Sequence, residues 1–85
     1  MNKSLLFAEK VTRLRIVVGY SQDYVANAWG ISQAALSKLE NGRTHWSLER
    51  AEQAAQFYGL TLEELRTNDT AKLLIKALHH RFQGV

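Results

Sequence analysis

Residues 22–41 read QDYVANAWGISQAALSKLEN, and this spacing predicts two short helices joined at a fixed angle by a glycine turn. Apolar residues at helical intervals mark one face of each helix, Val25 and Trp29 on the first and Leu36 and Leu39 on the second. Gly30 supplies the positive φ angle that ends the first helix. The two apolar faces are therefore expected to pack against each other.

Polar and small residues complete this two-helix unit. Ser21 and Ser32 precede the two helices, where each hydroxyl can accept a free backbone N–H as an N-cap. Ala26 falls where the helices approach most closely, and its single methyl group permits that contact. The remaining side chains of the second helix are predicted to point away from the packed face: Gln33, Ala34, Ser37 and Lys38. These side chains are free to contact a ligand.

The sequence around this unit resembles the helix-turn-helix domain of the XRE family, which includes phage Cro proteins and repressors. The resemblance covers roughly residues 8–66 and is far more specific than a lone glycine motif. It rests on these matches: Leu14-Arg15, Gly19-Tyr20-Ser21-Gln22, Ala26, Gly30-Ile31-Ser32-Gln33, Leu39-Glu40-Asn41-Gly42-Arg43, Ser47-Leu48-Glu49 and Tyr58-Gly59-Leu60. It implies an all-α, lambda-repressor-like bundle of five helices, in which the second and third helices form the DNA-binding unit.

The resemblance also implies which residues contact DNA, because the second helix of the unit lies in the major groove in this family. Four residues are expected to contact bases: Gln33, Ala34, Ser37 and Lys38. Five are expected to contact phosphates: Gln22, Ser32, Asn41, Arg43 and Thr44. The Gln33 amide suits the N6 and N7 edge of adenine, Ala34 a thymine methyl, and Lys38 the O6 and N7 atoms of guanine. The alternative for Gln33 and Lys38 is simple solvation at the helix surface.

Arg15 and Glu40 resemble functional charges, but in the family the corresponding pair forms a partly buried ion bridge between the first and third helices. We therefore expect a structural role for both residues. Removing either one should be strongly destabilising, because the charge of its partner would then be left without a counterion.

Aromatic residues replace smaller ones at several positions of the family pattern. Trp29 is expected in the core, where the family usually has leucine. Ala51 and Ala54 occupy positions where larger aliphatic residues are typical, and Trp46 and Phe57 are expected to help fill the space they leave. This departure concerns the packing and not the groove-facing surface.

The remaining helices follow from caps and breaks in the sequence. The first is expected over about residues 4–18 and the fourth between Ser47 and Gly59. The fifth begins at Thr61, which has capping-box spacing to Glu64. Apolar residues recur at intervals of three and four, so no strand is expected. Residues 1–68 thus form the expected DNA-binding domain, with the helix-turn-helix unit at 22–41.

Residues 69–85 are expected to form a sixth, amphipathic helix that the five-helix domain does not require. Its predicted apolar stripe contains Ala71, Leu74, Ile75, Leu78 and Phe82, widened by Leu73 and Ala77. We expect this helix to pack across the first helix, or against its mate in a second subunit as a dimerisation element. The simpler alternative is a helix that caps the core of its own monomer.

The charge distribution favours a nucleic acid partner. The chain has a net charge of +3, and its 85 residues allow one domain with a modest core. The first half, residues 1–45, holds six Lys and Arg against three Asp and Glu, whereas residues 46–85 hold five of each. The positive excess thus lies in the half that carries the two-helix unit, where a phosphate backbone would need it.

The composition argues against several other classes of protein. There are no cysteines, no apolar run of membrane-spanning length and no secretory signal, so we expect a cytoplasmic protein without membrane attachment. His79 and His80 are adjacent and diverge by about 100° on a helix, while His45 is distant in sequence, so no metal site is expected. No cofactor motif and no catalytic trio is visible, so an enzyme is not expected.

We therefore predict a DNA-binding transcriptional regulator, a repressor that binds a palindromic operator in double-stranded DNA as a homodimer. Its half-sites would lie about one DNA turn apart, roughly 34 Å. A phage repressor, a restriction-modification controller and an antitoxin all fit, with a toxin or polymerase as a further protein partner. The alternative is an interaction module whose last helix binds a partner protein, with DNA binding secondary. An RNA-binding protein fits less well, since no aromatic platform for single strands is evident.

Overall fold

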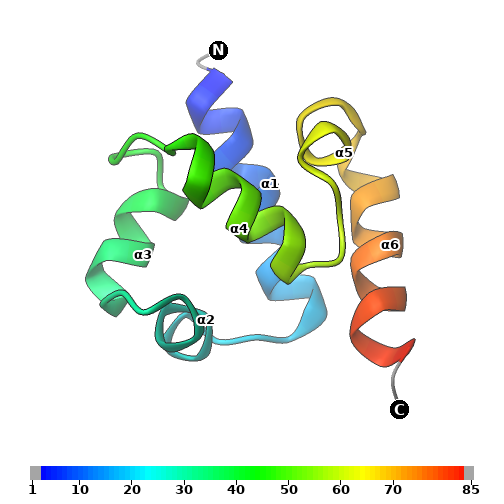
Figure 1. Cartoon of the computed structure of the whole chain (residues 1–85), viewed down its shortest axis with the longest axis horizontal. Coiled ribbons are helices and arrows are strands. Elements are labelled where there is room, and N and C mark those ends of the chain that lie inside the picture. Colours follow the sequence, from blue (N-terminus) through cyan, green and yellow to red (C-terminus); the bar gives the residue numbers. More distant parts are fainter. Residues whose placement is uncertain (1–2, 84–85) are drawn as a thin grey trace.

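Six helices and the turns between them make up residues 3–83, the part of the chain that the computed structural model describes (Figure 1). They are α1 (Lys3–Val18), α2 (Gln22–Trp29), α3 (Gln33–Glu40), α4 (Leu48–Phe57), α5 (Leu62–Thr67) and α6 (Thr70–Gln83). Within this range every regular element is a helix, which confirms the all-α prediction and the order of the helices.

The helix ends lie where the sequence signals predict them. Three serines cap α2, α3 and α4, and each hydroxyl accepts the backbone N–H three residues later at 3.0 to 3.1 Å: Ser21, Ser32 and Ser47. Gly30 follows α2 with a φ angle of 69°, as the left-handed end of a helix requires. Thr61 and Glu64 form the predicted capping box at the start of α5.

The core is a single cluster to which all six helices contribute. In Figure 1, α2 and α3 lie at one end of the molecule, α5 and α6 at the other, and α1 and α4 between them. The predicted apolar faces meet inside: Val25 and Leu36 are fully buried, and Trp29 and Leu39 are each 6% exposed. This packing fixes the angle between α2 and α3, and so determines which side of α3 faces outward.

Aromatic rings fill the space beneath the helix-turn-helix unit. Trp29 packs edge-to-face on Trp46 and on Phe57, with ring centroids 6.2 and 5.9 Å apart. The indole Nε1 of Trp46 donates to the Leu39 carbonyl at 3.0 Å and so ties the turn after α3 to the end of that helix. Trp29 lies in the core as the sequence predicted.

Helix α6 runs beside α1 (Figure 1), which confirms that it packs across the first helix. The prediction of which residues form the centre of the buried apolar stripe was wrong. Leu73 and Ala77 are buried, Leu74 and Leu78 are half-buried, and the predicted stripe members Ala71, Ile75 and Phe82 are exposed.

Packing against α1 and the core accounts for this orientation of α6. Lys76, on an exposed side of α6, pairs with Glu64 of α5. The face of Leu73 and Ala77 meets the core, and Ile75 and Phe82 lie on the outer surface.

None of the helices within residues 3–83 combines the length and the apolar character that crossing a lipid bilayer requires.

Candidate nucleic-acid interface

Helix α3 has one buried side and one free side. Leu36, Leu39 and Glu40 are buried, whereas Gln33, Ala34 and Lys38 are exposed and Ser37 is half-buried. The exposed side begins directly after the Ser32 cap, so the first turn of the helix presents both its side chains and its free backbone N–H groups to solvent. The four residues expected to contact bases thus share the outward side of one eight-residue helix.

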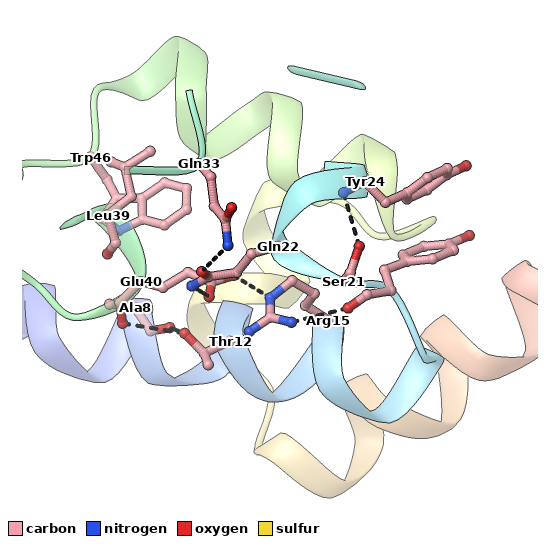
Figure 2. Close-up of polar contacts among 11 residues, drawn as sticks. Ala8, Thr12, Arg15, Ser21, Gln22, Tyr24, Gln33, Leu39, Glu40 and Trp46 are labelled. Atoms are coloured by element: carbon pink, nitrogen blue, oxygen red, sulfur yellow. Dashed lines mark hydrogen bonds and ion pairs between the residues drawn. The ribbon is translucent and has the colours of Figure 1, made fainter. Parts of the chain in front are cut away.

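A chain of polar contacts runs from this outward side into the core (Figure 2). Gln33 Nε2 lies 3.5 Å from Gln22 Oε1, and Gln22 Nε2 donates to Glu40 Oε1 at 2.9 Å. Glu40 Oε2 accepts from Arg15 Nε at 2.8 Å, and a second Arg15 nitrogen donates to the Tyr20 carbonyl at 3.0 Å. Glu40 is only 7% exposed, so its charge is compensated by Arg15 and Gln22 inside the fold.

The side chain of Gln22 lies between two other polar side chains. Its amide contacts Glu40 and Gln33, and the phosphate contact that the sequence predicts for it stays a prediction. Its backbone N–H remains at the start of α2, where an anion would be favoured. Gln22 thus lies between Gln33 at the surface and Glu40 in the core, and Glu40 is in turn paired with Arg15.

Tyr58 lies close to this buried ion pair but has no part in the outer surface. Burial raises the pKa of its hydroxyl, and the negative charge of Glu40 raises the pKa further. Tyr58 is therefore a neutral core residue at physiological pH. Its hydroxyl has no hydrogen-bond partner among the described residues.

A shallow hollow lies between α3 and the start of α4. Four of the expected contact residues line it, Ser32, Ala34, Lys38 and Thr44, together with His45 and Arg50. His45 and Arg50 were missed by the sequence reasoning, because they come to this surface only through the turn after α3. The hollow is basic on its α4 side, which suits a phosphate strand passing beside the groove.

The loop after α3 carries the other two expected phosphate contacts. The Asn41 side-chain oxygen accepts the backbone N–H of Arg43 at 3.2 Å, and Arg43 itself is exposed. The backbone N–H groups of Arg43 and Thr44 both donate to the Lys38 carbonyl, at 2.9 and 3.2 Å. Asn41 therefore shapes the loop, while Arg43 and the Thr44 hydroxyl remain available to a ligand.

A second hollow lies between the start of α2 and the start of α3. Its lining includes Ser21, Asp23, Tyr24, Asn27, Ser32 and Gln33. Both N-cap serines thus open onto one surface together with the first side chain of α3. Tyr24 and Asn27 were also missed, since in the sequence they read only as the polar side of α2.

Comparison with known proteins identifies the family to which this two-helix unit belongs. The model of the helix-turn-helix family matches residues 13–65, which include all of α2, α3 and α4. The chain belongs to this family. Among curated proteins, the cryptic phage CTXphi transcriptional repressor RstR of Vibrio cholerae is 33% identical over 75 residues, which are 84% of this chain and 68% of the relative. Comparison with solved structures gives no significant match.

The helix-turn-helix family of the XRE type is the one that the sequence resembled. Membership makes this protein a DNA-binding transcriptional regulator and not an enzyme. The exposed side of α3 is accordingly the surface on which DNA contacts are to be sought.

Proposed function

We propose that this regulator is a sequence-specific repressor that reads a palindromic operator with α3 in the major groove. The observation that carries the proposal is the exposure of Gln33, Ala34 and Lys38 on a helix whose opposite side is buried. A helix fixed in this way can enter the groove as a rigid body, with its first turn at the base edges.

The proposed contacts divide into those that read bases and those that hold phosphates. Gln33, Ala34, Ser37 and Lys38 read base edges, with Gln33 held in place by Gln22. Ser32, Arg43, Thr44 and the backbone N–H of Gln22 hold phosphates, and Asn41 supports their loop. The phosphate contacts set the position of α3, and the base contacts give it sequence preference.

Repression is proposed because the curated relative is a phage transcriptional repressor. A small protein of this kind acts most simply by occupying its operator and excluding polymerase. The site of action would then be the cytoplasm, where the DNA is.

The proposed active form is a homodimer, because one eight-residue helix covers only half of a palindromic site. Exposed apolar residues lie on two helices that pack side by side, Ile16 and Val17 on α1 and Ile75 and Phe82 on α6. We propose this surface as the dimer contact, with residues 1–68 as the DNA-binding domain and residues 69–85 as the dimerisation element. Residues 1, 2, 84 and 85 of these segments lie outside the described part of the chain.

Two substitutions test the division of roles. Gln33→Ala should cost about 1 to 3 kcal/mol of discrimination at one base pair and leave binding to random duplex unchanged. Arg43→Ala should weaken binding to all sequences alike and lower the salt dependence by about one ion per protomer. Both are measured by fluorescence anisotropy on an operator selected from a random duplex pool. Equal losses for Gln33→Ala on operator and random DNA would refute its role in base reading.

The interaction module weighed from the sequence makes a different prediction in the same assay. The apolar surface of α6 would suit a protein partner, but such a module gives no salt-dependent binding to duplex DNA. A wild-type protein that binds no duplex at low ionic strength would therefore favour the module over the repressor.

A further inference from the structure

Arg81 of α6 lies beside aromatic residues near the start of α2. The Arg81 guanidinium carbon is 4.3 Å from the ring centroid of Tyr20 and 5.2 Å from that of Phe82. The Tyr20 ring packs in turn on Tyr24, at 4.8 Å between centroids. Stacking fixes the plane of the guanidinium and leaves its edge N–H groups free to donate. No carboxylate lies within ion-pair distance of Arg81 among the described residues.

This arginine is continuous with the recognition surface. One hollow is lined by Gly19, Tyr20, Ser21, Tyr24 and Arg81. Ser21 and Tyr24 also line the hollow that contains Ser32 and Gln33. The two hollows thus adjoin at Ser21 and Tyr24, between the start of α3 and the last turn of α6.

The positively charged side chains on the two sides of α3 bear on the role of Arg81. A helix in the major groove is flanked by two phosphate strands, and each strand favours nearby cations. On the α4 side, Lys38 and Arg43 are exposed, and Arg50 is half-buried and donates to Gln53. Among the described residues lining the two hollows on the α2 side, Asp23 is acidic and Arg81 is the single cation. Arg15 cannot serve there, because Glu40 holds it.

We infer that Arg81 donates to a DNA phosphate on the strand that passes the start of α2, with the Tyr24 hydroxyl beside it. The C-terminal helix then takes part directly in DNA binding, in addition to its packing on α1. This inference rests on the proposed entry of α3 into the major groove, since that entry places a phosphate strand along the α2 side.

The test uses the full chain and a random-sequence duplex, with affinity measured by fluorescence anisotropy over a series of salt concentrations. Arg81→Ala is expected to weaken binding roughly three- to tenfold near 0.1 M salt and to lower the slope of log affinity against log salt by about one per protomer. Arg81→Lys should retain most of the slope, because it keeps the charge. A purely structural role in stacking on Tyr20 would leave the slope unchanged.

Lys72→Ala is the matched control, because Lys72 is an exposed cation near the other end of the same helix. It changes the net charge equally and should leave both affinity and slope close to wild type. Equal slopes for the Arg81→Ala and Lys72→Ala variants would overturn the inference and leave the proposed function standing. Failure of the wild type to bind any duplex would instead overturn the proposed function, and the inference with it. Circular dichroism melting of each variant establishes that it is folded at the assay temperature.

Discussion

Glu40 is a buried charge that connects the core to the residues proposed to contact DNA. It lies at the end of α3, accepts from Arg15 of α1 and from Gln22 of α2, and so joins three helices through one carboxylate. A buried carboxylate is costly unless its oxygens are bonded, and here each oxygen has a donor. The same contacts place the Gln22 amide 3.5 Å from that of Gln33, so the ion pair is connected to the surface that we propose α3 presents to DNA.

Loss of one member of this pair should therefore be severe. We expect Arg15→Ala to lower the free energy of unfolding by about 3 to 5 kcal/mol, because Glu40 is left charged inside the fold. Urea denaturation followed by circular dichroism gives the value. The double variant Arg15→Met with Glu40→Leu should regain most of the loss, since it removes both charges and keeps the volume. A double variant as unstable as the single one would show that packing, and not charge, is what Arg15 provides.

The sequence predicted the contacts of some residues and not of others. The caps at Ser21, Ser32 and Ser47 depend on neighbours within three residues, so local spacing was sufficient. The Arg15–Glu40 pair required the family resemblance, because its members are 25 positions apart. Arg50 and Arg81 were not predicted, since their surfaces are assembled only when α4 and α6 take their places.

At the scale of elements, the number, order and ends of the helices were predictable. The orientation of α6 was not. Helical periodicity showed that α6 is amphipathic, but a broad apolar stripe does not determine which part of it meets the core. Packing on α1 and the core selects Leu73 and Ala77. Ile75 and Phe82 consequently remain on the outer surface.

Glu64 both caps α5 and holds α6, which makes its charge a determinant of acid stability. The Lys76 ammonium first, and then the Thr61 backbone N–H, lower the pKa of this carboxyl below its ordinary value of 4.5. A lowered folded-state pKa gives stability that is fully present above the unfolded value and is lost as the pH falls through the folded one. The contribution of Glu64 is thus expected to disappear on acidification below about pH 4.5.

We therefore expect Glu64→Gln to be less stable than wild type at pH 7 and to approach it as the pH falls toward 3. Thermal melting at a series of pH values gives this comparison. Glu63→Gln is the matched control, because it removes the same charge from the same turn without touching the capping box or Lys76. The expectation fails if the two variants show the same difference from wild type at every pH.

At the scale of the whole molecule, the proposals assign one set of exposed residues to DNA and another to a second copy of the chain. The proposed DNA surface comprises α3, the start of α2 and the start of α4, all within the residues that the family model matches, and is extended by Arg81 of α6. The apolar residues proposed for the dimer contact are exposed on α1 and α6. Removal of α6 by truncation would not isolate its role in assembly, because Leu73 and Ala77 belong to the core. The dimer contact has to be tested at exposed positions instead.

Ile75→Glu provides that test, because Ile75 is 69% exposed and its replacement should leave the monomer folded. In the proposed contact each introduced carboxylate would lose water among apolar residues of the partner, and we expect dimerisation to weaken at least about tenfold. Sedimentation equilibrium measures this, and operator affinity should fall in parallel while the affinity of a single half-site stays the same. Leu48→Glu is the matched control, since Leu48 is 63% exposed on α4 and lies away from the proposed contact. Dissociation by Leu48→Glu and not by Ile75→Glu would move the dimer interface to α4, and a wild type that is monomeric at every concentration would remove it altogether.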